Sequence, residues 1–121
     1  MRLEKLTREF VELPSFSLKW KKLGFNEDDL AKLEEILLDN PKIGTVLKGT
    51  GKLRKMRFAF ENRGKSGSAR VIYVDFEIYE KIYLVGVFQK SEKDNITQGE
   101  ANEFKKLICL LEEDLAKGET K

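Results

Sequence analysis

The chain contains no histidine, and this absence excludes several kinds of active site. A Ser-His-Asp triad needs an imidazole as its general base, and zinc sites of mixed cysteine and histidine type need one as a ligand. Cys109 is the only cysteine, and without histidine it lacks the base that would activate it as a nucleophile. Its apolar neighbours instead predict a buried structural cysteine, because a free thiol behaves as a small hydrophobe. We expect neither a metal ion nor a cofactor.

Long hydrophobic runs are also missing. No apolar stretch approaches the roughly 20 residues that span a bilayer, so we expect no membrane contact. Residues 1–9 contain no apolar core of a secretory signal, which predicts an intracellular, cytoplasmic protein. The 121 residues are 40% hydrophobic, and a chain of this length builds one core rather than two. The sequence therefore predicts a single domain spanning residues 1–121.

Positive charge, in contrast, is abundant in one window. Between Lys42 and Arg70 there are nine basic residues and one acid, a net charge of +8, whereas the whole chain carries only +2. The other residues therefore sum to −6. A concentrated basic field attracts polyanions, because each Lys or Arg set against a phosphate releases a condensed counterion. Nucleic acid is the predicted partner.

The N-terminal part predicts a strand and two helices. We expect a short strand over residues 9–13 that stops at Pro14, since proline cannot continue a ladder of hydrogen bonds. A helical hairpin should follow, in which Ser15 or Ser17 caps the first helix and Asn26 caps the second.

The remainder predicts a β-meander and a final helix. The predicted strands cover residues 53–60, 70–78 and 82–88. Alternation slips near Arg54-Lys55, which suggests a bulge there. The glycines of residues 44–51 predict a turn rather than a phosphate-binding loop, since a P-loop precedes a helix and here a strand follows. The last helix should begin with a capping box of Thr97 and Glu100 and end at Gly118. Its apolar stripe comprises Phe104, Leu107, Ile108, Leu111 and Leu115.

These elements together predict an α+β fold. The helices are expected to cover one face of a mostly antiparallel sheet and to leave the other face available. On the first long strand, Lys55 and Arg57 should emerge on the same side, about 7 Å apart. The hairpin should bring Arg70 beside them, and Lys90 ends the next strand.

Such a cluster can catalyse RNA cleavage in which the 2′-hydroxyl of the RNA attacks the adjacent phosphate. That reaction needs a base, positive charge at the phosphorane and an acid for the leaving oxygen. Without histidine, a Lys, a Tyr or a carboxylate must move the protons, and Arg must stabilise the charge. The candidate catalytic residues are Lys55, Arg57, Arg70, Tyr73 and Lys90.

Other cations of the window are candidates for binding RNA without taking part in the chemistry. They are Lys48, Lys52, Arg54, Arg63 and Lys65. Two alternatives stay open. These side chains can pair with the acids of the helices, or the protein can be a non-catalytic RNA-binding module.

Four short motifs follow one another along the chain. They are Asn40-Pro41-Lys42-Ile43-Gly44, Gly49-Thr50-Gly51-Lys52-Leu53-Arg54-Lys55-Met56-Arg57, Gly64-Lys65-Ser66-Gly67 and Arg70-Val71-Ile72-Tyr73. In this order they resemble the RelE/HigB family of bacterial toxins, and most closely the HigB-like branch of the RelE/ParE superfamily. The likeness covers roughly residues 10–111.

The resemblance implies the toxin of a type II toxin–antitoxin system with a small α+β fold. Such toxins are ribosome-dependent mRNA interferases, endoribonucleases that enter the vacant A site, cut mRNA there and inhibit translation. By position, Lys55 and Arg57 match the family's basic pair, Arg70 matches the arginine that opens a strand, and Lys90 matches the basic residue after the last strand. Some relatives use a C-terminal tyrosine or histidine as the base, but none follows Lys90 here, so the base and the acid stay open. The sister ParE toxins share the fold and poison DNA gyrase, an alternative that the basic cluster disfavours.

The resemblance also implies a cognate antitoxin protein and contact with ribosomal RNA. The antitoxin is expected to cover the basic window or to block ribosome entry from elsewhere. Trp20 and Phe25 of the helical hairpin offer a second docking surface, unless they belong to the core. This chain has no DNA-reading motif, so any operator binding should come from the partner.

Overall fold

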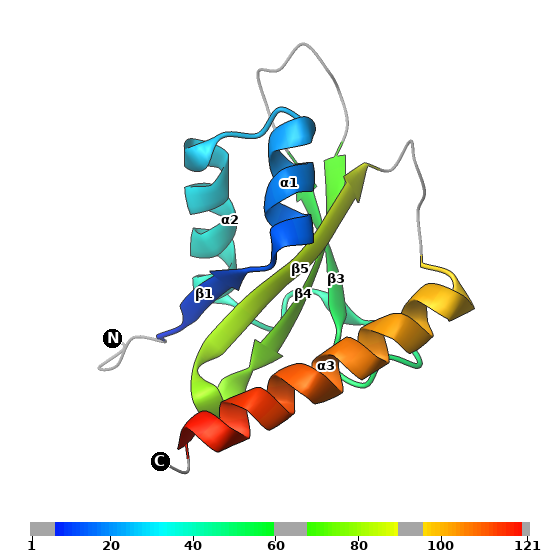
Figure 1. Ribbon diagram of the computed structural model, residues 1–121. Coiled ribbons are helices and arrows are strands. Elements are labelled where there is room, and N and C mark those ends of the chain that lie inside the picture. Colours follow the sequence, from blue (N-terminus) through cyan, green and yellow to red (C-terminus); the bar gives the residue numbers. More distant parts are fainter. Residues whose placement is uncertain (1–6, 60–67, 90–95, 120–121) are drawn as a thin grey trace.

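The computed structural model describes residues 7–59, 68–89 and 96–119, which form three α-helices and one five-stranded sheet (Figure 1). In chain order the elements are β1 (Glu9–Glu12), α1 (Pro14–Lys22), α2 (Glu27–Asp39), β2 (Thr45–Val46), β3 (Arg54–Ala59), β4 (Ser68–Phe76), the 3-10 turn η1 (Glu77–Tyr79), β5 (Lys81–Gln89) and α3 (Gln98–Glu119). The strands lie in the order β1-β5-β4-β3-β2, with β1 parallel to β5 and every other pair antiparallel. The predicted α+β fold and its meander are confirmed, and β2 is an additional strand within the segment predicted as a turn.

The helical hairpin forms as predicted, although one of its caps differs. Leu13 occupies the N-cap of α1, and Pro14 follows at the first helical position, where its missing N–H costs nothing. The prediction of a serine cap is therefore wrong. Ser15 instead donates its hydroxyl proton to the carbonyl of Val85 at 3.1 Å, which ties α1 to β5. Asn26 caps α2 as predicted, in a reciprocal capping box with Asp29.

The irregularity in the sheet lies in β5 rather than near Arg54-Lys55. The register pairs Ile72 with Gly86 but Tyr73 with Leu84, so Val85 is an extra residue on β5. Such a bulge locally bends the strand that carries it. The register of β3 with β4 runs without a break, so the predicted bulge in β3 is wrong.

The predicted capping box of α3 is confirmed, because the Thr97 hydroxyl accepts from the Glu100 amide and the Glu100 carboxylate accepts from the Thr97 amide. The whole predicted apolar stripe packs into one core cluster. Two expectations are wrong. The helix continues through Gly118 to Glu119, and Cys109 is exposed. Each residue turns the helix by about 100°, so Cys109 lies off the stripe that contains its neighbour Ile108.

Helices cover both faces of the sheet, which corrects the prediction that one face stays open (Figure 1). The helices α1 and α2 bury Phe16, Trp20, Leu33 and Leu37 against one face, with Phe58, Val71 and Leu84 among their partners on the strands. The helix α3 buries its stripe against the other face, which includes Val74, Phe76 and Val85. Within the described ranges, none of the helices is both long enough and apolar enough to cross a bilayer.

Trp20 and Phe25 belong to the first of these cores. Their rings stack with centroids 4.2 Å apart, and both approach Phe58 on β3. Both side chains are buried. They hold the hairpin on the sheet, so neither is an exposed aromatic on a docking surface.

Candidate functional site

Two arginines face one another across neighbouring strands. The register pairs Arg57 of β3 directly with Arg70 of β4, and the sequence had indicated only that the hairpin brings Arg70 beside Lys55 and Arg57. Directly opposed residues of antiparallel strands have Cβ atoms roughly 5 Å apart, and like charges at that distance are destabilising. Arg57 is exposed and Arg70 half-buried. We call these two residues the arginine pair, and their position favours the binding of an anion over this part of the sheet.

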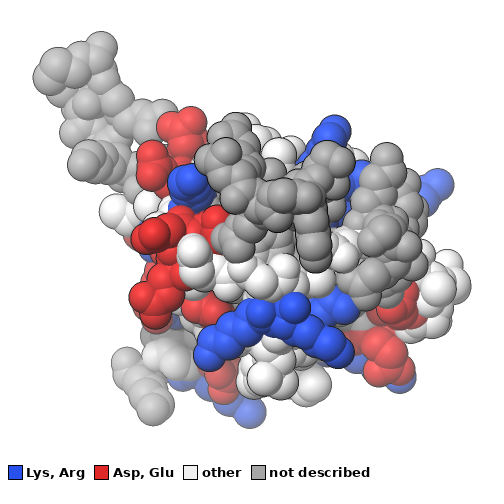
Figure 2. Space-filling view, turned by 90° about the horizontal axis from the view of Figure 1, so that it is seen from above, with Lys and Arg blue, Asp and Glu red and all other residues white. Residues whose placement is uncertain are grey.

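Lys55 extends the arginine pair along β3. It lies two residues before Arg57, so alternation places it on the same face, the face that carries α3. Its register partner on β4 is Ile72, a residue of the core beneath α3. Figure 2 looks down on this end of the molecule and shows basic side chains across its lower centre and upper right, with acidic side chains on the left and at the lower right.

A groove borders the arginine pair on the side of β5. The register pairs Arg70 with Phe88, and Phe88 lines a groove of about 450 Å³ together with Ile72, Val85, Gly86, Val87, Ser15, Lys19, Ile96 and Phe104. We call this the β5 groove. Sequence reasoning missed it, because its walls come from α1, β4, β5 and α3. The one local signal was Gly86, a glycine within an otherwise β-branched and aromatic strand.

Tyr73 does not join the cluster. Its side chain lies in the core beneath α1 and α2, on the face opposite the arginine pair, and is fully buried. The hydroxyl donates to the carbonyl of Pro41 at 2.8 Å and accepts from the amide of Gly44 at 2.9 Å. A Cβ on Gly44 would lie 2.9 Å from the Tyr73 ring, which explains the glycine. Tyr73 therefore holds the segment Asn40-Pro41-Lys42-Ile43-Gly44 in place.

Replacing Tyr73 by phenylalanine tests whether it is structural. Burial raises the pKa of the Tyr73 hydroxyl, so the folded protein keeps a proton that the unfolded chain releases near pH 10. Its contribution to stability is complete below that pH and falls as the pH rises further. We expect Tyr73→Phe to lower the free energy of unfolding at pH 7 by about 1–3 kcal/mol, since a buried carbonyl and amide lose their partner. Denaturation in urea measures the change, and an unchanged free energy of unfolding in Tyr73→Phe would contradict this role.

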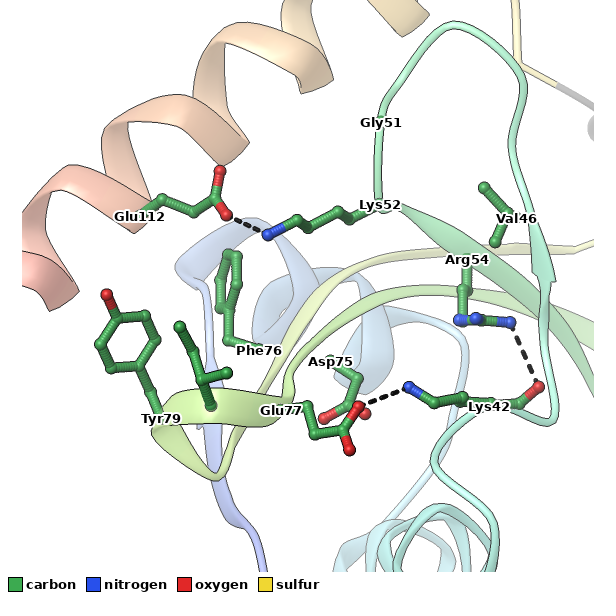
Figure 3. Close-up of a pocket in the computed structure, with 11 residues that line it drawn as sticks. Lys42, Val46, Gly51, Lys52, Arg54, Asp75, Phe76, Glu77, Tyr79 and Glu112 are labelled. Carbon is green, nitrogen blue, oxygen red and sulfur yellow. Dashed lines mark hydrogen bonds and ion pairs between the residues drawn. The ribbon is translucent and has the colours of Figure 1, made fainter.

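Arg54 and Lys52, both candidates for RNA binding, lie at the other end of β3 in a pocket of about 350 Å³ (Figure 3). Arg54 donates to the carbonyls of Gly44 at 2.6 Å and Lys42 at 3.2 Å, so it holds the same segment as Tyr73. Lys52 forms an ion pair with Glu112 of α3, and its ammonium lies 5.8 Å from the centroid of the Phe76 ring. The structure brings neither residue to the arginine pair.

A third cation of the basic window, Lys42, lines the same pocket. Lys42 and Glu77 form an ion pair of 2.7 Å, and the hydrogen bond from Lys42 lowers the pKa of the Glu77 carboxyl (Figure 3). Part of the +8 window is therefore neutralised by acids of η1 and α3, the alternative that the sequence had left open. Of the other candidates, Lys48 is exposed in the turn after β2, whereas Arg63, Lys65 and Lys90 lie outside the described residues.

Comparison with known families supports the resemblance noted from the motifs. A model of the RelE family, described as the RelE toxin of the RelE / RelB toxin-antitoxin system, matches residues 39–117. The match spans α3 up to residue 117 and every strand except β1, and it contains the arginine pair, Lys55 and most of the β5 groove. Because it covers well over half of the 121 residues, the assignment does not depend on a single motif. The chain belongs to the RelE family of toxins of toxin–antitoxin systems.

Proposed function

We propose that this toxin is a ribosome-dependent mRNA interferase, of the HigB-like branch, that cuts mRNA in the ribosomal A site. The observation that carries the proposal is the register that sets Arg57 opposite Arg70, with Lys55 on the same face. This register supports the proposal because guanidinium groups on two neighbouring strands can bind one phosphate from two sides, and each can do so bidentately.

The chemistry assigned to these side chains is a transesterification at phosphorus. The ribose 2′-oxygen attacks the adjacent phosphorus, the bond from phosphorus to the 5′-oxygen breaks, and the strand ends in a cyclic phosphate. Negative charge grows on the non-bridging oxygens during the attack, and the arginine pair stabilises it there. One proton must leave the 2′-hydroxyl and one must reach the 5′-oxygen, and the proposal gives these two transfers to Lys55, on the same face as the arginine pair, and Lys90.

Induced expression tests the function directly. The proposal expects arrest of growth and translation, with primer extension showing new 5′ ends within translated codons, at positions occupied by the A site. Purified RNA mixed with the protein alone should stay intact. Intact messages during arrest, together with a strong DNA-damage response, would instead identify a toxin that acts on gyrase.

The toxin should be neutralised by a protein antitoxin in the cytoplasm, where the ribosomes are. Co-expression with the neighbouring small open reading frame should restore growth and yield a complex that co-purifies. A failure of every adjacent gene to suppress toxicity would contradict this part of the proposal.

Two lysines of the basic window should differ in their effect on ribosome binding. Lys48 is exposed, whereas Lys52 is paired with Glu112. We expect Lys48→Ala to weaken ribosome binding and to reduce the slope of log affinity against log salt by about 0.7–0.9, as the loss of one phosphate contact does. Lys52→Ala should change that slope much less, because its charge is already offset by a carboxylate. Equal slopes for the two variants in sedimentation at several salt concentrations would contradict this difference.

A further inference from the structure

We propose that a single strand of RNA crosses the molecule over the edge of β5, from the arginine pair through the β5 groove to the lysines of α1. This inference rests on the proposed function, since it describes the path of the RNA at that same site. It adds the lysines of α1, which lie outside the basic window, and a set of apolar contacts for the bases.

The position of the groove follows from where β1 ends. β1 pairs with β5 only over Lys81–Leu84, and the chain then turns into α1 at Pro14. Beyond Leu84 the outer side of β5 is flanked by α1 on one face of the sheet and by the start of α3 on the other. The groove is lined accordingly by Ser15 and Lys19 of α1 and by Phe104 of α3. It therefore connects the face that carries the arginine pair with the face that carries α1.

The lining of the groove suits unpaired bases. Ile72, Val85, Phe88 and Phe104 give it apolar and aromatic walls. Proteins that bind single strands combine such surfaces, on which bases stack whatever their sequence, with basic groups that follow the phosphates. Gly86 leaves room at the floor, because a Cβ built on it meets no atom within 4 Å. The groove of about 450 Å³ is large enough for a base and open enough for a chain to enter and leave.

The two helices of the hairpin carry opposite charges, and the basic one, α1, is the helix that lines the β5 groove. α1 carries Lys19, Lys21 and Lys22 in its last turn and no acid at all, whereas α2 carries six acids and a single lysine, Lys32. Lysines in a last turn also offset the helix dipole, but that effect does not require Lys19 to line a groove. An RNA strand that runs from the arginine pair through the β5 groove therefore brings its following phosphates to these lysines.

Filling the groove tests the path. Valine at position 86 would occupy the open floor, and a β-branched residue is favourable in a strand, so Gly86→Val should fold normally. We expect Gly86→Val to weaken binding of a fluorescent eight-nucleotide uridine RNA to the full-length protein roughly tenfold, the effect of losing one stacked base. Fluorescence anisotropy at low salt measures the affinity, and thermal unfolding confirms that the variant is folded.

Charge removal gives a second, independent measurement. Lys19→Ala should reduce the salt slope of RNA binding by about 0.7, the value for one phosphate contact to a single strand. Lys32→Ala on the acidic helix is the matched control and should leave the slope unchanged. Equal slopes for Lys19→Ala and Lys32→Ala, wild-type affinity in folded Gly86→Val, or no binding of the RNA by the wild-type protein would each overturn the path.

Different results would overturn the RNA path and the proposed function. Cleavage of ribosome-bound mRNA by the wild-type protein, together with unchanged RNA binding in Gly86→Val, would overturn the path and leave the function standing. Weakened RNA binding in Gly86→Val, in a protein that never cuts translated mRNA, would support the path and overturn the function.

Discussion

Replacement of Arg70 by alanine should lower the rate of single-turnover cleavage of translated mRNA by roughly 30- to 1,000-fold, equivalent to about 2–4 kcal/mol of transition-state stabilisation. Arg70 lies opposite Arg57 and beside Phe88, so it sits between the other arginine and the β5 groove. In the proposed function its charge stabilises the oxygens of the phosphate that is under attack. Arg57→Ala should produce a loss of the same order.

Measurements of ribosome affinity, and a conservative substitution, distinguish a catalytic role of Arg70 from a role in attracting RNA. Ribosome affinity should fall much less than cleavage in Arg70→Ala, because the remaining cations share the long-range field. Arg70→Lys keeps the charge but loses the planar fork, so it should recover affinity fully and cleavage only partly. Equal losses of affinity and cleavage in Arg70→Ala would mean that the arginine pair only attracts RNA.

Replacement of Asp75 by alanine should lower the free energy of unfolding by about 3–5 kcal/mol, a large share of the roughly 5–15 kcal/mol typical of a small protein. The Asp75 carboxylate accepts two hydrogen bonds from Arg8, at 2.7 and 3.3 Å, and only 6% of the Arg8 side chain and 2% of the Asp75 side chain are exposed. Removal of the carboxylate leaves a buried guanidinium without its counter-charge. Denaturation in urea at pH 7 measures the loss.

A paired substitution provides the control. Arg8→Met combined with Asp75→Leu removes both charges, so it should recover most of the stability that Asp75→Ala loses. The ion pair lies at the opposite end of β4 from Arg70, so cleavage by the folded double variant should be close to that of wild type. A loss below about 1 kcal/mol in Asp75→Ala would show that water reaches the pair, as it does at exposed ion pairs.

The sequence was most informative where an interaction spans only a few residues. A cap joins a side chain and a backbone amide three residues apart, so short patterns are sufficient to predict the cap at Asn26 and the capping box of Thr97 and Glu100. The placement of Arg70 beside Arg57 was predictable for a related reason. A hairpin brings the residues on either side of its loop together, and alternation then gives them a common face.

The sequence was least informative where a side chain bonds to a distant backbone atom. Arg54 and Tyr73 stand among the residues expected to bind or cut RNA, yet their partners are carbonyl and amide groups of Pro41, Lys42 and Gly44. Nothing in the pattern of side chains indicates that interaction. The same limit applies to the face that α3 covers, since its apolar stripe fits either side of the sheet equally well.

The parallel pairing of β1 with β5 has a consequence for the order of events during synthesis. Glu9 pairs with Lys81, and Arg8 bonds to Asp75, so the first strand of the chain finds its partners about seventy residues later. Contacts between residues so far apart form late, because a long loop must close before they contribute any stability. We therefore expect a nascent chain that stops before Lys81 to lack a folded N-terminus, whatever its antiparallel hairpin does. A cell that makes this toxin should then be exposed to its activity only when translation of the message is nearly complete.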